Sequence, residues 1–130
     1  MSVLLDTNFL IGLLRGVQLY WEYLEQLLEQ TAPFFNDTAT TEIYTGCHPS
    51  ESAETERVLS LFRALPIDGE IADLAGRFVY RFARRGLTLH LEDAMIGATA
   101  VKEQLILITR NVDHFPMLSL GRDLIQFPTR

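Results

Sequence analysis

The sequence contains a single cysteine, Cys47, among its 130 residues, so no disulfide can form within the chain. This cysteine usage is compatible with a reducing compartment. No apolar run approaches the ~20 residues that a membrane-spanning helix needs. The first residues lack a basic segment, and Asp6 and Asn8 interrupt their apolar stretch. We therefore expect no secretory signal and a cytoplasmic protein.

Positive charge is also scarce. The chain has 11 Lys and Arg residues against 17 Asp and Glu residues, which gives a formal net charge of −6. This balance argues against a general nucleic-acid binder, because such proteins present a basic face. Four basic residues nevertheless recur at helical spacing, namely Arg77, Arg81, Arg84 and Arg85. They are either a solvated helix face or a basic ridge on an acidic protein.

Short apolar runs alternate with segments of helical periodicity along the whole chain. The length suits one domain, 1–130, and no linker or repeat divides it. The expected strands are 3–5, 34–35, 65–67, 105–108 and 124–127. The expected helices are 7–14, 19–30, one that carries Glu42 and is capped by Asp37 or Thr38, 52–64, 69–85, and one that begins near Asp93. This alternation predicts an α/β fold with a mostly parallel sheet and helices on both of its faces.

Three carboxylates stand in apolar or small-residue surroundings: Asp6 in LLDTNFLIGLL, Glu42 in TATTEIYTG and Asp93 in LEDAMIGATA. A fourth, Asp113, follows the apolar run LILITRN. Ligands of open α/β sheets bind at the carboxyl ends of the strands, where such residues gather. Clustered carboxylates raise one another's pKa unless a cation joins them, and hard oxygen ligands suit Mg²⁺ or Mn²⁺. Such an ion can polarise a phosphoryl oxygen and activate water.

Each of these acids also has an ordinary structural interpretation. Asp6 and Asp93 are typical of helix caps and first turns. Glu42 could be an exposed helix residue, and Asp113 a turn residue. The residue type at each position therefore leaves both interpretations open.

Two further residues follow the last apolar strand. Thr109 either hydrogen-bonds a ligating carboxylate or a phosphate, or satisfies local backbone groups. Arg110 either contacts a nucleic-acid backbone or is solvated. The three histidines lack the spacing of zinc ligands, and the sequence gives them no role.

Taken in order, these motifs resemble the PIN-domain ribonucleases, and within them the VapC-type toxins of bacterial toxin–antitoxin pairs. LLDTNFLI is similar to the family's opening strand with its first metal-binding aspartate, Asp6, followed by Thr7 and Asn8. TEIYTG carries the second acid, Glu42, and EDAMIGATA carries the third, Asp93. LILITRNVDHF resembles the family's final motif. Four matches in order cover nearly the whole chain.

The sequence departs from the family pattern at one position. The fourth acid of many members would fall at Asn111, which is 18 residues after Asp93. Asparagine is a familiar variant there, commonly with an acid two residues later, which is Asp113 in this chain. An asparagine can coordinate a metal through its carbonyl oxygen but supplies neither charge nor a base. The resemblance leaves open whether Asn111 or Asp113 completes the site.

The resemblance implies a three-layer α/β/α PIN-like domain that hydrolyses RNA with the help of Mg²⁺, with Mn²⁺ as an alternative ion. The implied site residues are the metal ligands Asp6, Glu42 and Asp93, the further catalytic positions Asn111 and Asp113, and the substrate-binding residues Thr7, Asn8, Thr109 and Arg110. The implied partners are RNA, a cognate antitoxin protein and a second copy of the chain in a homodimer. No membrane is expected among the partners. Two alternatives stay open: a PIN-like protein that binds RNA or a partner with little cleavage, and a nuclease directed at DNA, since an acid cluster does not itself sense a 2′-hydroxyl.

Overall fold

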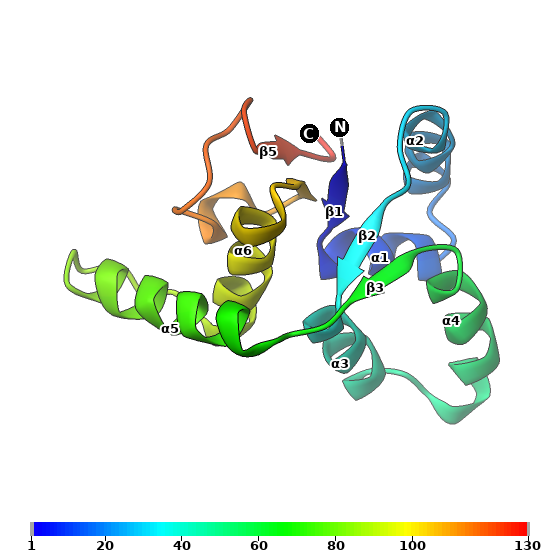
Figure 1. Ribbon diagram of the computed structural model, residues 1–130. Helices are drawn as coiled ribbons and strands as arrows, with labels where there is room; N and C mark the ends of the chain where they lie inside the picture. The colour runs from blue at the N-terminus through cyan, green and yellow to red at the C-terminus, as the bar shows by residue number, and fades with distance from the viewer. Residues whose placement is uncertain (1, 130) are drawn as a thin grey trace.

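The strands form one all-parallel sheet in the computed structural model, which describes residues 2–129 (Figure 1). Its order is β3-β2-β1-β4-β5, so β1 lies at the centre. The strands are β1 (Val3–Leu5), β2 (Phe34–Asn36), β3 (Arg63–Leu65), β4 (Ile106–Thr109) and β5 (Leu124–Gln126). Because all five strands run in the same direction, their carboxyl ends meet at one edge of the sheet.

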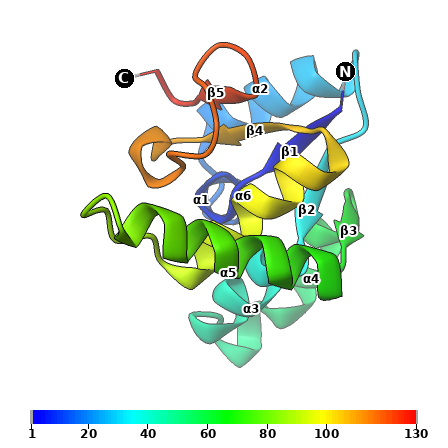
Figure 2. The ribbon, with the colours of Figure 1, turned by 60° about the vertical axis from the view of Figure 1, so that its left-hand side comes forward.

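Helices cover both faces of this sheet, as the alternation in the sequence predicts. They are α1 (Thr7–Leu14), α2 (Gln18–Leu28), α3 (Asp37–Thr45), α4 (Ser52–Leu59), α5 (Gly69–Ala83), α6 (Leu91–Glu103) and the short 3₁₀ helices η1 (Pro49–Glu51) and η2 (Val112–His114). The helices α1, α2 and α4 pack on one face, whereas α6 covers the other and α5 packs against α6 (Figures 1 and 2). The predicted three-layer α/β/α architecture is confirmed. Among the described residues, no helix combines the length and apolarity that crossing a membrane requires.

The central strand shows why the two faces can both be apolar. Val3 and Leu5 pack into the cluster that holds α1, α2 and α4, whereas Leu4 packs into the cluster that holds α6. Successive residues of a strand point to opposite faces, so an unbroken apolar run is what a strand buried on both sides needs. A third cluster, which includes Phe78 and Phe82, joins α5 to α6.

The third strand lies two residues earlier than the sequence predicts. The expected helix 52–64 ends at Leu59, and the expected strand 65–67 lies at Arg63–Leu65. Pro66 has no backbone N–H to donate to a neighbouring strand, so the strand ends before it. Pairing with β2, which sets Asn36 opposite Leu65, decides the register.

Smaller differences from the sequence-based expectations occur at the cap of α3 and in the fourth strand. The cap of α3 is Asn36, whose side chain accepts a hydrogen bond of 2.7 Å from the backbone N–H of Thr38, and not Asp37 or Thr38. Asp37 instead lies in the first turn of α3, where an acid is favourable. The fourth strand, expected at 105–108, begins and ends one residue later because its pairing with β1 starts at Ile106.

Candidate functional site

A cavity of about 280 Å³ opens where β1 and β4 end. Its walls come from α1, α3, α6 and the segment after β4. The residues that line it are Asp6, Thr7, Asn8, Ile11, Glu42, His90, Glu92, Asp93, Asn111 and His114. We call this cavity the acidic pocket. It brings together side chains that the sequence separates by more than a hundred positions.

Asp6 is the most firmly held of these side chains. Its backbone N–H donates to the carbonyl of Ile108 at 3.1 Å, which continues the pairing of β1 with β4. Its Oδ1 accepts the backbone N–H of Thr7 at 2.8 Å and so caps α1, and its Oδ2 accepts the hydroxyl of Thr109 at 2.6 Å. The buried carboxylate therefore caps a helix and lines the pocket at once. Its two oxygens have further lone pairs that these bonds leave free.

Thr109 lies under the acidic pocket and does not line it. Its side chain is fully buried. Besides donating to Asp6, its hydroxyl accepts the side-chain amide of Asn8 at 3.3 Å and the backbone N–H of Asn111 at 3.0 Å. One donor and two acceptor positions are all that a hydroxyl offers, so this group is saturated. Thr109 thus orients three residues of the pocket.

Glu42 reaches the pocket from α3. The hydroxyl of Thr7 donates to its Oε1 at 2.7 Å, which links α3 to the start of α1. The glutamate is half-buried, so the position is not the exposed helix face that its sequence context allows. A single threonine, Thr7, thereby contacts two of the three acids, through its backbone N–H and through its hydroxyl.

Asp93 lies in the first turn of α6, with Nδ1 of His114 at 3.3 Å from its Oδ2. The two groups form an ion pair when the imidazole is protonated. The sequence gives no signal for His114 or His90 in the site, because neither has a ligand-like spacing to another histidine. Only the position of η2 beside α6 brings His114 to Asp93.

The three carboxyls share an electrostatic environment that disfavours their charged forms. Burial raises the pKa of Asp6, of Glu42 and of Asp93, and in each case the charge of a neighbouring carboxylate raises the pKa further. For Asp6 that neighbour is Asp93, and for Glu42 it is Asp6. The hydrogen bonds from Thr109 and Thr7 oppose the shift at Asp6. A bound cation would relieve this repulsion.

The donor set fits a hard divalent ion in its chemistry, since it consists of carboxylate and amide oxygens. The side chains are not gathered around one point, however. Across residues 2–129, no three His, Cys, Asp or Glu side chains stand at a spacing that would hold a metal ion. Oxygens of Asp6 and Glu42 are instead engaged by Thr7 and Thr109. Binding an ion would require these carboxylates to turn toward it.

Besides Thr109, two of the predicted site residues do not line the acidic pocket. Asp113 is exposed on η2 and lines an adjoining cavity of about 240 Å³, which it shares with Asp93 and His114. Arg110 is exposed, and its backbone N–H donates to Oδ1 of Asn8 at 3.5 Å. Asn111, by contrast, lines the acidic pocket itself. Of the two candidates for the fourth position, the structure places Asn111 beside the three acids.

The parallel sheet, the three layers and the acidic pocket at the strand ends define a PIN domain, and the chain belongs to this family, whose PIN domain model matches residues 3–117. It is similar to Ribonuclease VapC10 of Mycobacterium tuberculosis, with 35% identity over 115 residues that cover 88% of this chain and 86% of that protein. The resemblance to VapC-type proteins noted in the sequence is thereby confirmed.

Solved structures give the same result. The chain superposes on a toxin–antitoxin complex from Klebsiella pneumoniae with a TM-score of 0.78 and 29% identity, covering 96% of this chain and 97% of that one. It superposes on VapBC2 from Rickettsia felis, bound to a DNA fragment from its promoter, with a TM-score of 0.83. There the identity is 19%, over 97% of this chain and 98% of that one, and the likeness is one of fold.

Proposed function

We propose that this protein is a Mg²⁺-dependent endoribonuclease that acts as the toxin of a toxin–antitoxin pair, and that residues 1–130 form a single PIN domain. One observation carries the proposal. Asp6, Glu42 and Asp93 come from three different elements of the fold and line one pocket at the carboxyl ends of the strands. The identity to a ribonuclease over 88% of the chain supports the same activity.

In this proposal Asp6, Glu42 and Asp93 hold the ion. When bound, Mg²⁺ would supply a more acidic water and neutralise charge on the phosphodiester. Mn²⁺ offers the same coordination chemistry. Thr7 and Thr109 hold the two oxygens of Asp6, so this carboxylate would keep its place at the end of β1 while its side chain turns toward the ion.

The protein must also accept a proton from the attacking water. Asn111 can offer a carbonyl oxygen but cannot act as a base. Thr7 engages only Oε1 of Glu42, so this carboxylate could hold the ion through one oxygen and accept the proton on the other. We assign the proton transfer to Glu42 and a coordinating role to Asn111, with Asp113 as an outer acid in the neighbouring cavity.

Substrate contacts fall to the polar residues around the acids. Thr7 and Asn8 line the pocket, and Arg110 is exposed and joined to Asn8 through its backbone. Amide, hydroxyl and guanidinium groups are the usual donors to phosphate oxygens. Thr109 would act through Asp6 and Asn8, because its own hydroxyl is already saturated.

A cognate antitoxin and a second copy of the chain complete the proposal. The similar structure from Klebsiella pneumoniae is a toxin–antitoxin complex, which supports an antitoxin as partner. In the cytoplasm, the bound antitoxin would keep RNA out of the acidic pocket until the antitoxin itself is removed. Co-purification with the product of an adjacent reading frame, and sedimentation of the free chain, test the antitoxin and the homodimer in turn.

The activity is tested with end-labelled RNA incubated with the wild type, Asp6→Asn and Asp93→Asn, in Mg²⁺ and in EDTA. Each substitution keeps the side-chain shape and removes one charge. We expect Mg²⁺-dependent cleavage by the wild type and none by either variant. Glu25→Gln, an exposed change on α2 with the same loss of charge, is the control that should cleave normally. Wild-type cleavage by a folded Asp6→Asn protein would overturn the proposal.

Two other outcomes point to the alternatives. Equal or faster cleavage of single-stranded DNA would identify a DNA-directed nuclease. The presence of Asn111 in place of a fourth acid favours a second function, RNA or partner binding with little cleavage. In that case the wild type would bind RNA in EDTA, and addition of Mg²⁺ would produce no fragments.

A further inference from the structure

The helix α5 carries a strongly basic surface that is separate from the acidic pocket. A hollow of about 900 Å³ lies along its exposed side. Five of the residues that line it form what we call the basic face: Arg77, Tyr80, Arg81, Arg84 and Arg85. Four of the 11 Lys and Arg residues of the chain therefore lie close together, Arg77 and Arg81 in α5 and Arg84 and Arg85 in the turn that follows it.

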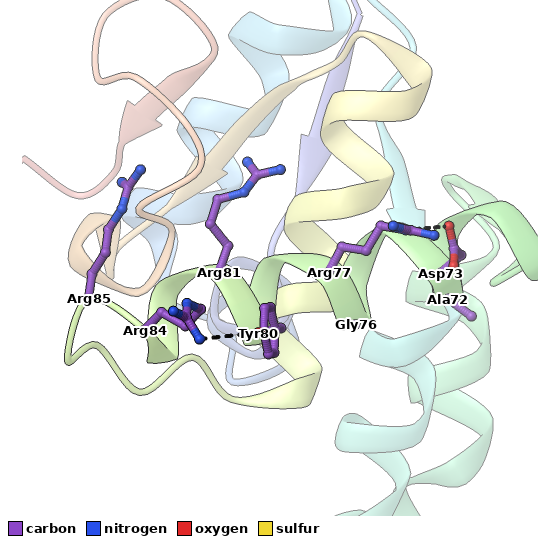
Figure 3. Close-up of a pocket in the computed structure, with 8 residues that line it drawn as sticks. All are labelled: Ala72, Asp73, Gly76, Arg77, Tyr80, Arg81, Arg84 and Arg85. Carbon is purple, nitrogen blue, oxygen red and sulfur yellow. Dashed lines mark hydrogen bonds and ion pairs between the residues drawn. The ribbon is translucent and has the colours of Figure 1, made fainter.

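Three of these arginines, Arg81, Arg84 and Arg85, have no acidic partner among residues 2–129. Arg77 forms an ion pair with Asp73 at 2.9 Å. Arg81 and Arg85 make no ion pair with any residue in 2–129, and both are exposed. Figure 3 shows their side chains extending in the same direction, that of Arg81 from α5 and that of Arg85 from the turn after it. Unpaired guanidinium groups one turn apart are suited to successive phosphates of one strand.

The same arginines are held in place by aromatic rings. The guanidinium of Arg81 lies 5.5 Å from the ring centre of Phe78, and that of Arg85 lies 5.6 Å from the ring centre of Phe82. Both rings are buried in the cluster between α5 and α6. Cation–π contact of this kind limits the freedom of a long side chain without neutralising its charge.

Tyr80 adds a surface for a base. Tyr80 is 65% exposed, so its ring is open to contact from a ligand. Arg84 donates to its hydroxyl at 3.2 Å, with the guanidinium 5.6 Å from the ring centre (Figure 3). An exposed ring among unpaired arginines is the combination by which proteins bind single-stranded nucleic acid, the ring stacking on a base and the cations following the backbone.

The basic face leads toward the acidic pocket. The segment after α5 runs through Leu87 to His90 and enters α6, whose first turn holds Asp93. A cavity of about 240 Å³ lined by Leu87, His90 and Asp93 lies along this route. The acidic pocket shares His90 and Asp93 with that cavity. The residues that follow the basic face thus line a cavity that adjoins the acidic pocket, and we expect a strand held on α5 to continue along it.

We propose that the basic face of α5 binds the phosphate backbone of single-stranded RNA beside the cleavage site, with Tyr80 stacking on a base. The inference rests on the proposed function, because the RNA held there is the strand to be cut. It also gives RNA a way to approach a protein whose net charge of −6 repels it at long range.

The test measures binding of a fluorescent single-stranded RNA in EDTA, where no metal-dependent cleavage occurs, over a series of NaCl concentrations. The variant is Arg81→Gln with Arg85→Gln. Its matched control is Arg15→Gln with Arg63→Gln, which removes the same charge from exposed positions on other elements. We expect the control to keep the wild-type salt dependence. The α5 variant should flatten the log–log slope by about 0.7 for each lost phosphate contact.

The aromatic residue is tested separately. Tyr80→Ala should weaken RNA binding roughly tenfold at every salt concentration, since stacking does not depend on counterions. Tyr80→Phe keeps the ring and should bind as the wild type does. The proposal is overturned if the α5 variant follows its control, or if sedimentation shows a changed oligomeric state with unchanged RNA affinity, which would make α5 a protein interface.

Failure of this inference is distinguishable from failure of the proposed ribonuclease activity. Absence of cleavage in Mg²⁺ by a wild type that binds RNA in EDTA would remove the activity and leave the arginine comparison valid. Normal cleavage together with unchanged binding by the α5 variant would remove only the role of the basic face.

Discussion

The hydroxyl of Thr109 donates a hydrogen bond of 2.6 Å to Oδ2 of Asp6, although 103 positions separate the two residues. The same hydroxyl accepts from Asn8 and from the backbone of Asn111. The end of β4 therefore sets the orientation of the carboxylate at the end of β1.

Thr109→Val should remove this connection at nearly constant volume. The buried Asp6 oxygen and the Asn111 N–H would lose their partner, which costs about 1–3 kcal/mol in the free energy of unfolding. Because the hydrogen bond from Thr109 lowers the pKa of Asp6, its loss should also raise that pKa further and weaken binding of Mn²⁺. Urea unfolding and Mn²⁺ titration measure the two effects. Thr109→Ser keeps the hydroxyl and should stay close to the wild type; a valine variant equal to the serine variant would contradict the role of this bond.

The pH dependence of stability should reveal the buried charge of Asp6. Burial raises the pKa of this carboxyl above 3.8 in the folded protein, so the native state holds its proton more tightly than the unfolded state does. In EDTA, its contribution to the free energy of unfolding should therefore fall as pH rises from about 3.8 through the raised folded pKa, and stay low above it.

The Asp6→Asn variant lacks this titrating group, because an asparagine side chain does not ionise. Its stability relative to the wild type should increase over that pH window and stay higher at neutral pH, while asparagine still caps α1. Denaturant unfolding of both proteins at a series of pH values gives the difference. A difference that does not change with pH would mean that Asp6 carries no unfavourable buried charge.

Divalent ions should reverse the same effect. A ligand that binds only the folded state stabilises it by about 2.7 kcal/mol at a concentration 100 times its Kd. We expect Mn²⁺ to raise the melting temperature of the wild type at neutral pH and to leave that of Asp6→Asn nearly unchanged. Ca²⁺, which demands a larger coordination shell, serves as the comparison ion.

The fourth position of the site is tested by exchanging its charge. Asn111→Asp adds a carboxylate to the acidic pocket and should tighten Mn²⁺ binding by about tenfold or more, equivalent to about 1.4 kcal/mol. Asp113 lies outside that pocket, so Asp113→Ala should change Mn²⁺ affinity much less. The opposite order of effects would assign the fourth position to Asp113, and no effect from either would confine the ion to the first three acids.

Replacing Gly12 or Gly76 by alanine should change the stability of the protein in opposite directions. A Cβ atom on Gly12 would lie 2.7 Å from ring atoms of Tyr20, whose ring is itself packed edge-on against Phe9 at 5.2 Å. Gly12→Ala should therefore cost about 1–3 kcal/mol through overpacking. A Cβ on Gly76, within α5, would meet open space, and Gly76→Ala should gain about 0.5–1 kcal/mol. Thermal unfolding compares the two, and destabilisation by both would show that the space around Gly76 is not free.

The class and order of the fold follow from the sequence alone. The apolar run Val3–Leu5 and the helical spacing after it predict a buried strand and α1, and the structure has both at those bounds. These features depend on neighbouring residues, whose periodicity is visible along the chain. Asp6, Glu42 and Asp93 were recognisable in the same way, as single acids in apolar surroundings that match the motifs of a family.

Tertiary structure decided the rest. The saturation of Thr109, the pairing of His114 with Asp93 and the place of Asn111 in the acidic pocket have no local signal in the sequence. They depend on the register between β1 and β4, which sets Leu5 opposite Ile108. The hydrogen bonds of that register join residues about a hundred positions apart, and they position the side chains that follow each strand. A side chain's partners across such a sheet edge are a property of the pairing, and periodicity within either segment does not contain it.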